Sequence, residues 1–395
     1  MSSHPHNKRQ LSVGVSAAVC LCVWGNAASA QNLLPGWQEQ YSVELRGGLE
    51  RSNSGFEHII TITPEVRLLR EADGQTYEFD ATAEIDQTGT DAVRINSIGI
   101  GGTAGLRLSR NSSASVSARY GIGQARPSDP DTPTGVAQSG HTQELQVGGA
   151  YEQQFGRFTG SLRGGFGRYQ QANSLLADNN YQSNADQNYW GSQVGGRLSY
   201  QFTPRLAAFI DAELSKQIYD AASTSLSAKR NNWTFETRLG GTYTLNEQIS
   251  AEASVGMALQ DYDDASLADL RLYSFDASAN WQISPSGVVT LSYGTELNPT
   301  QRAGEVMEIQ DTAQLSYAHR FNNQWSASAS TSLETRKYQQ TSAEVKTFGA
   351  ALGVDYQINS DLSAFASYSY SLREETAVAP ERRHRIEAGL RFSRP

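Results

Sequence analysis

The sequence of 395 residues predicts an all-β protein that forms a single transmembrane antiparallel up-and-down β-barrel of about 18 strands, with 16 as the alternative count. Three observations predict this fold. Long segments alternate apolar and polar residues with a period of two, and their connections alternate between short and long. The polar face of these segments also carries charged residues, which a soluble core would not tolerate.

The first element, residues 1–30, is predicted to be a secretory signal peptide. Lys8 and Arg9 form a basic start, and the apolar stretch after them is too short to span a bilayer as a helix. Small residues at positions 28–30 then supply a cleavage site, so we expect cleavage between Ala30 and Gln31. A buried N-terminal helix is the alternative explanation of this segment.

Both cysteines of the chain, Cys20 and Cys22, lie inside the predicted signal peptide. The residues before them do not resemble a lipoprotein signal. The rest of the chain has no cysteine, which excludes a disulfide, a thiolate metal site and a cysteine nucleophile. We expect residues 31–40 to form a short periplasmic segment and residues 41–395 to form the barrel.

Runs of alternating residues follow one another from residue 41 to the end of the chain. In residues 77–86, for example, Tyr, Phe, Ala, Ala and Ile alternate with acidic residues and a threonine. Each run has about ten to fifteen residues, the length of a tilted membrane-spanning strand. The predicted strands lie near residues 41–51, 56–71, 75–87, 95–110, 112–124, 141–154, 156–170, 187–202, 205–219, 232–245, 248–262, 270–283, 286–297, 307–321, 324–339, 344–358, 360–373 and 381–393.

The connections between these runs are short after every second strand. Asp73-Gly74 and Phe155-Gly156 are typical of the short breaks, whereas residues 125–140, 171–186 and 220–231 are long ones. Outer-membrane barrels have short periplasmic turns and longer extracellular loops. The pattern therefore predicts that both termini lie on the periplasmic side, and that inward folding of a long loop could narrow the pore.

The apolar face of the strands carries aromatic residues near both ends, with smaller apolar residues between them. This arrangement is typical of the girdles at the two interfaces of a membrane, and it indicates a multi-pass protein of the bacterial outer membrane. The predicted girdle residues are Phe158, Trp190, Phe202, Trp233, Tyr243, Tyr273, Trp281, Phe321, Trp325 and Tyr356.

The opposite face of the strands is predicted to line a polar, water-accessible lumen. Opposed acidic and basic walls would orient a dipolar solute there, but the charges could equally be solvated or paired with one another. The candidate pore charges are Arg107, Arg119, Arg163, Arg197, Arg238, Glu78, Asp80, Glu84, Asp211, Glu213, Glu236, Glu252 and Asp276.

Several other functions are disfavoured by the sequence. A net charge of −9 argues against nucleic-acid binding. Histidines 58, 141, 319 and 384 have no evident Ser or Asp partner on a shared face, so we expect no enzyme. The segment Asp261-Tyr262-Asp263-Asp264, with Asp269, could bind a divalent cation through oxygen ligands, although a solvated acidic loop explains it better. We expect no metal and no cofactor.

The whole chain after the signal resembles the β-barrel porin 2 type of outer-membrane porin family from Gram-negative bacteria. The features that carry this resemblance are the Ala-Ser-Ala signal end, the alternating strands and turns, and the closing Gly389-Leu390-Arg391-Phe392. The final aromatic residue looks like the signal by which the barrel-assembly machinery recognises its substrates, although three residues follow it here. The resemblance also implies an association with extracellular polysaccharide export.

The function predicted from the sequence is a channel for hydrophilic solutes, with the outer-membrane step of exopolysaccharide export as its more specific form. Its expected partners are outer-membrane lipid, the barrel-assembly machinery, a hydrophilic solute or polysaccharide, and periplasmic export components. A structural or anchoring barrel with a plugged lumen is the alternative, and an outer-membrane barrel hydrolase is the weaker one.

Overall fold

A computed structural model describes residues 36–394 of the chain, apart from residues 54, 90–92, 125–135, 247, 301, 303 and 377. The predicted signal peptide and its cleavage site at Ala30 and Gln31 lie outside the described residues. Within the described ranges, no helix combines the length and the apolar character that a membrane crossing requires.

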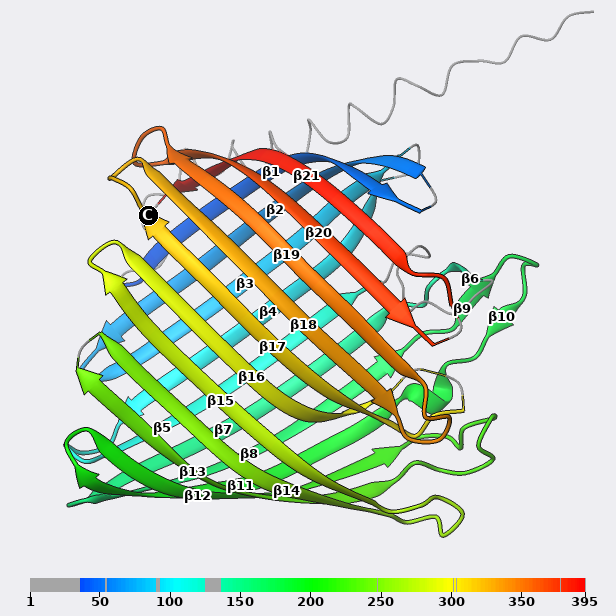
Figure 1. The fold of residues 1–395 in the computed structure, drawn as a ribbon, viewed down its shortest axis with the longest axis horizontal. Helices are drawn as coiled ribbons and strands as arrows, with labels where there is room; N and C mark the ends of the chain where they lie inside the picture. The colour runs from blue at the N-terminus through cyan, green and yellow to red at the C-terminus, as the bar shows by residue number, and fades with distance from the viewer. Residues whose placement is uncertain are drawn as a thin grey trace, which may run out of the picture.

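Eighteen long antiparallel strands form one closed barrel (Figure 1). Each strand pairs with its neighbours along the chain, and the first and last strands close the barrel through eleven residue pairs from Tyr41–Arg394 to Arg51–His384. The strands are β1 (Gln38–Ser52), β2 (Gly55–Ala72), β3 (Gln75–Thr88), β4 (Arg94–Arg107), β5 (Ser112–Gly123), β7 (Thr142–Phe155), β8 (Phe158–Gln171), β11 (Tyr189–Thr203), β12 (Leu206–Tyr219), β13 (Asn232–Asn246), β14 (Ile249–Tyr262), β15 (Leu270–Ser284), β16 (Gly287–Pro299), β17 (Met307–Arg320), β18 (Trp325–Tyr338), β19 (Glu344–Gln357), β20 (Leu362–Glu375) and β21 (Glu381–Arg394).

The predicted fold and the count of eighteen strands are confirmed, and most strand ends lie within two residues of the predicted ones. The first strand differs, because it begins at Gln38 and not at residue 41. Residues 38–40 continue the ladder opposite residues 67–69 of β2. They carry no apolar alternation because this end of the barrel lies next to the short turns, outside the hydrocarbon band.

Two residues suffice to connect β2 and β3 because both adopt left-handed backbone conformations. Asp73 has φ +51° and Gly74 has φ +78°. A hairpin turn with two such residues has the twist that antiparallel strands need, and Asp-Gly is one of its preferred sequences. The short connections predicted at this end of the barrel thus follow from local turn chemistry.

Side-chain contacts identify which face of the wall points inward. Arg163 on β8 reaches Asp211 on β12 across the intervening β11, and Arg197 on β11 reaches Glu252 on β14 across two strands. Contacts that skip a strand are possible only on the concave face of a barrel, because side chains on the convex face diverge. The charged face therefore lines the lumen, and the alternate apolar residues point outward to lipid.

Small elements that the strand pattern did not predict lie in the long loops. Strands β6 (Val136–Gln138), β9 (Ser174–Leu176) and β10 (Tyr181–Gln182) form a three-stranded sheet, followed by the 3-10 helix η1 (Ala185–Gln187). Figure 1 shows this sheet beyond the strand ends, at the mouth of the barrel. The described parts of these two loops therefore do not fold deep into the lumen.

One contact between neighbouring strands is incomplete. β15 and β16 pair from Ser284–Gly287 at the turn end only as far as Ala277–Tyr293. Beyond that point β15 stays paired with β14 up to Leu270, while β16 stays paired with β17 up to Pro299. In Figure 1 the two hairpins diverge toward the loops, so the extracellular half of the wall has a seam at this position.

Candidate functional site: the polar lumen

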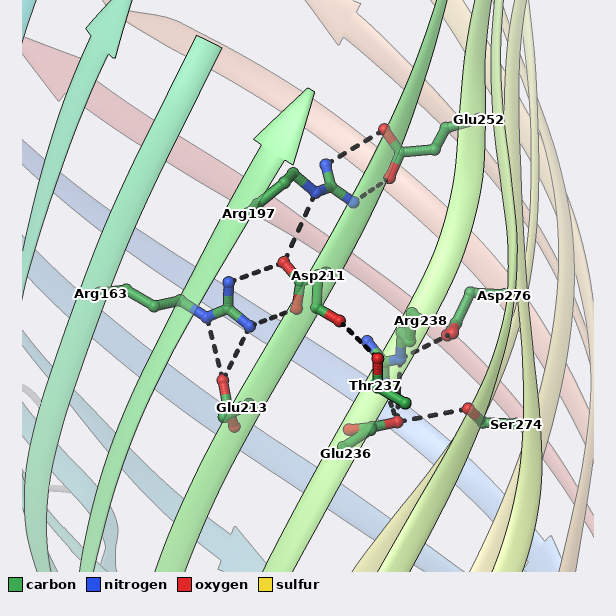
Figure 2. Close-up of polar contacts among 10 residues, drawn as sticks. All are labelled: Arg163, Arg197, Asp211, Glu213, Glu236, Thr237, Arg238, Glu252, Ser274 and Asp276. Atoms are coloured by element: carbon green, nitrogen blue, oxygen red, sulfur yellow. Dashed lines mark hydrogen bonds and ion pairs between the residues drawn. The ribbon is translucent and has the colours of Figure 1, made fainter. Parts of the chain in front are cut away.

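The central feature of the lumen is a set of ion pairs that we call the charge ladder: Arg163, Arg197, Asp211, Glu213, Glu236, Arg238, Glu252 and Asp276. These side chains come from six successive strands, β8 and β11 to β15, at neighbouring levels of the wall. They share the inward face because strand pairing places residues of the same parity side by side. Figure 2 shows them pointing toward one another across the strands.

Asp211 lies at the centre of the ladder. Both of its carboxylate oxygens accept hydrogen bonds from Arg163, at 2.7 and 2.8 Å, and Arg197 lies 3.5 Å away. Arg163 also donates to Glu213 at 2.9 Å. A forked guanidinium between two carboxylates is the geometry in which Arg holds anions most firmly.

The other members extend the ladder around the wall. Arg197 donates to Glu252 at 2.7 Å, and its guanidinium lies 3.6 Å from the centre of the Phe209 ring. Arg238 pairs with Glu236 at 2.7 Å and with Asp276 at 3.3 Å. Each cation thus has two acidic or aromatic neighbours, which fixes its direction in the lumen.

The remaining candidate pore charges lie on the first strands of the barrel. Arg119 pairs with Asp80 at 3.2 Å, Glu78 with Arg67 at 2.7 Å, and Glu84 with Arg46 at 3.6 Å. Arg107 lies at the turn end of β4. Its side chain is close to Gly74, so that a Cβ atom added at position 74 would contact it. The structure places all thirteen candidates on the inward face. The ion pairs of the ladder form two neighbouring groups, one of Arg163, Arg197, Asp211, Glu213 and Glu252 and one of Glu236, Arg238 and Asp276.

The pairing decides between the two arrangements that the sequence left open. Acidic and basic residues alternate within the ladder and do not form two opposed walls. The reason is that strands adjacent in space are adjacent in the chain, so each arginine lies next to carboxylates of the following strands. A water-filled lumen lined in this way presents closely spaced charges of both signs to a passing solute.

A cavity of about 740 Å³ adjoins the ladder inside the barrel. Its wall includes Glu213, Glu236 and Arg238 from the ladder, together with amide and hydroxyl side chains such as Gln193 and Ser215. Two tyrosines that the sequence analysis did not single out, Tyr169 and Tyr189, also line it. Their rings stack at a centroid distance of 5.5 Å because the two residues are paired partners on β8 and β11.

Arg230 ties the loops together above this cavity, and sequence reasoning missed it. It is 2% exposed, donates to the carbonyl oxygens of Thr300 and Asp186 at 2.8 Å each, and lies 4.6 Å from the Tyr219 ring centre. A lone arginine in a long loop gives no signal in the sequence, since its partners come from two other loops.

The predicted girdle residues lie on the outward face at both ends of the strands. Nine of the ten are exposed, and Tyr356 is half-buried because its ring lies tilted against that of Trp325, with 4.6 Å between the ring centroids. Trp190 and Trp233, near the loop end, also carry cations over their rings: Arg168 at 4.8 Å and Lys216 at 4.7 Å.

The acidic loop that follows β14 does not gather its carboxylates around one point. Asp263 pairs with Lys216, Asp264 accepts hydrogen bonds from Ser266, and Asp269 accepts one from the backbone of Tyr262. The bonds from Ser266 lower the pKa of Asp264 below its ordinary value. Among the described residues, no group of three or more acidic, histidine or cysteine side chains is placed to hold a metal ion.

A family model described as Putative beta-barrel porin 2 matches residues 43–394, which is most of the chain and all of the barrel wall except the first five residues of β1. The chain belongs to this family. The resemblance suggested by the sequence is confirmed, and the family places the protein in the bacterial outer membrane as a porin-like channel. The members of this family are porins, which are channels and not enzymes.

Solved structures that resemble this porin include OccK3 (OpdO) of Pseudomonas aeruginosa, with 15% identity, a TM-score of 0.45, and coverage of 90% of this chain and 96% of that one. OpdK of the same species, solved with vanillate, has 8% identity, a TM-score of 0.46, and coverage of 90% and 99%. The siderophore receptor PirA, also from Pseudomonas aeruginosa, has 11% identity, a TM-score of 0.48, and coverage of 91% and 80%. No curated protein matches the sequence.

Proposed function

We propose that this porin passes small hydrophilic solutes across the outer membrane, and that the charge ladder is the part of the lumen that selects among them. The observation that carries the proposal is the position of the ladder: it adjoins the lumen cavity and offers fixed charges of both signs to water. Such a surface favours solutes with hydroxyl groups or with both charges, and it disfavours apolar ones.

The proposal is tested by ion conductance in planar lipid bilayers. We expect discrete conductance steps from the purified protein, and a change in ion selectivity when Arg163 and Arg197 are both replaced by Gln. The double replacement of Arg67 and Arg119, which lie on early strands and outside the ladder, serves as the control for a general loss of charge. A barrel that gives no steps would instead be the structural or anchoring barrel with a plugged lumen.

A more specific form of the function, the outer-membrane step of polysaccharide export, is supported by the two stacked tyrosines. Tyr169 and Tyr189 line the cavity beside Gln193, so an aromatic surface and hydrogen-bonding amides lie together, a combination suited to a sugar ring. The solute in this form is a secreted polysaccharide, and periplasmic export components would deliver it to the turn end of the barrel.

This form is tested by current blockade. Added oligosaccharides should interrupt the ion current, and replacement of Tyr169 by Ala should shorten the interruptions about tenfold, as the loss of one stacking contact predicts. The outward-facing Tyr151→Ala change is the matched control, since Tyr151 faces lipid. Unchanged interruptions in Tyr169→Ala would leave general diffusion as the function.

The predicted signal peptide, cleavage after Ala30, and assembly by the barrel-assembly machinery complete the proposal. Mass determination of the protein recovered from outer membranes tests the cleavage. A mature chain that begins at Gln31 is the expected result.

A further inference from the structure

The seam between β15 and β16 is closed because one part of the barrel wall overlaps the part next to it. We call residues 294–299 of β16 together with residues 307–313 of β17 the inner hairpin. On the outward face of β16, Leu291 is 48% exposed, as expected for a residue that meets lipid, yet Thr295, four residues further on the same face, is 5% exposed. The outward face is therefore covered once the strand passes the end of its pairing with β15.

The cover comes from the lumen face of the neighbouring hairpin. On β15 the inward Ser274 is 4% exposed while the outward Tyr273 is 83% exposed, and on β14 the inward Ala258 and Gln260 are buried. Tyr262 of β14 shares one apolar cluster with Met307 and Val306, against which Leu297 packs. The inner hairpin thus lies inside the barrel, against the lumen face of β14 and β15, and not edge to edge with them.

The overlap is imperfectly packed. The Gln260 side chain is fully buried in the overlap, and neither its amide nitrogen nor its amide oxygen has a hydrogen-bond partner among the described residues. The Tyr262 hydroxyl is also buried without a hydrogen-bond partner among them. Buried polar groups without partners destabilise the arrangement that buries them. Separation of the inner hairpin from β14 would return these groups to water.

The lumen cavity extends up to this overlap. Its wall runs from Glu213 and Arg238 of the charge ladder to Leu272, Leu297 and Met307 at the seam. One end of the cavity therefore carries the charge ladder, and the other adds these three apolar side chains beside polar ones such as Glu296 and Asn298. The seam itself lies in the extracellular half of the wall, where its outer side meets the outer leaflet of the membrane.

We propose that the seam between β15 and β16 is a lateral path between the lumen and the outer leaflet, with the inner hairpin as its gate. The molecule that takes this path is an amphiphile, whose polar head lies at the charge ladder and whose acyl chain lies along Leu272, Leu297 and Met307. This path goes beyond the aqueous channel proposed above, because it leads into the membrane and does not require ion flow.

The experiment places the purified protein in vesicles that contain a phospholipid with a photoactivatable acyl chain, and maps the labelled residues by mass spectrometry. If acyl chains enter the seam, Ala258, Ser274 and Leu297 will be labelled as well as outward residues such as Val255. Lumen-facing Ser115 and Ser117 of β5 give the background. Labelling of the three seam residues at no more than this background would overturn the proposal.

Two kinds of variant sharpen the result. Val306→Asp puts a charge into the apolar cluster, so it is expected to raise seam labelling severalfold, while Gln260→Leu removes the unpaired amide and is expected to lower it. Val306→Asp could fail to fold, and the mobility shift on heating before electrophoresis would reveal this. Gln260→Leu would then still test the gate. Equal labelling in Gln260→Leu and in the unmodified protein would contradict the proposal that the inner hairpin is a gate.

A cross-link separates this proposal from the channel function. Gln339, just after β18, donates to the carbonyl of Ala268 in the loop after β14 at 3.0 Å, so cysteines at both positions can be bridged by a short bifunctional thiol reagent. The background is Cys20→Ser/Cys22→Ser, which has no other cysteine. Bridging should abolish seam labelling and leave ion conductance intact. Seam labelling that persists after bridging would refute the gate, whereas absent conductance with normal labelling would refute only the channel.

Discussion

At the scale of single residues, the effect of a charged side chain in the lumen of this porin depends on its ion-pair partners, and not on the face of the strand alone. Parity along the strands predicts that Arg163 and Asp211 point inward, but it does not predict that they form a forked ion pair. That pair depends on the register of three strands. The consequence is a surface on which charges of both signs lie close together, and its properties change sharply when one member is removed.

Removal of the central carboxylate is the most informative single change. Asp211→Asn takes away a negative charge that lies against both Arg163 and Arg197, so we expect the channel to become more selective for anions. The free energy of unfolding should fall by about 1.5–3 kcal/mol, because Asp211 is buried and the change removes the charged acceptor of two hydrogen bonds from Arg163. The reversal potential in a salt gradient measures the first effect. Asp80→Asn, whose partner Arg119 is more exposed, should change it less, and equal shifts in the two variants would contradict the central role of Asp211.

A pH effect is expected at the outer rim of the barrel. Hydrogen bonds from Arg168 lower the pKa of Asp220 below its ordinary value of 3.8, and Arg168 also lies over the Trp190 ring. Because the pKa is lowered in the folded protein, the pair contributes stability above pH 3.8 and loses it as the pH falls below that value.

Fluorescence of Trp190 reports this titration. The difference spectrum between the unmodified protein and Trp190→Phe should be constant from neutral pH down to about pH 3.8 and should change below it. In Asp220→Asn the acid step should be missing. A step of the same size in that variant would show that another group is responsible.

At the scale of the strand, the barrel depends on strict alternation between lipid and water. Adjacent residues 329 and 330 near the middle of β18 show this clearly. Ala329 is paired with Leu352, which is 59% exposed to lipid, whereas Ser330 is paired with Ser316 and Ala351 on the lumen side. Two neighbouring positions thus lie in different solvents.

The same substitution at these two positions should have different costs. Ala329→Arg places a cation among acyl chains and should reduce the free energy of unfolding by about 2–4 kcal/mol. Ser330→Arg places the same cation in the aqueous lumen and should cost less than about 1 kcal/mol. Urea-dependent unfolding from phospholipid vesicles, followed by tryptophan fluorescence, measures both. Similar values for the two variants would mean that the faces of β18 are assigned wrongly.

At the scale of the whole molecule, closure between β1 and β21 requires close backbone approach at one glycine. A Cβ atom on Gly389 would lie 2.4 Å from the carbonyl oxygen of Leu45 and 2.6 Å from the Phe365 ring. Gly47, on the same pair of strands, would meet nothing within 4 Å. The backbone of β1 cannot move aside without losing its ladder to β2.

Gly389→Ala should therefore impair closure, whereas Gly47→Ala should be tolerated. We expect a severalfold lower yield of heat-modifiable, folded barrel for Gly389→Ala in a refolding assay, and a normal yield for Gly47→Ala. The assay is the mobility difference between unheated and heated samples on electrophoresis. Normal folding of Gly389→Ala would show that the closing strands can separate enough to admit a methyl group.

The sequence by itself determined the class of fold, a strand count of about eighteen with sixteen as the alternative, the faces of the wall and the end at which the termini lie. It could do so because each of these follows from local rules: a period of two in a bilayer, turn residues at fixed intervals, and aromatic residues at the interfaces. The family match and the closed eighteen-strand barrel confirm the fold and its membrane.

The tertiary structure alone decided which charges meet, which loops are tied by Arg230, and where the pairing between neighbouring strands is incomplete. The β15–β16 seam shows why: β16 has the same alternation as its neighbours, so nothing in its residues indicates that half of it leaves β15 and lies inside the barrel. Contacts of this kind join elements far apart in the chain, and their energies depend on curvature and register around the whole barrel. Local periodicity in the sequence carries no information about the curvature or the register of the whole barrel.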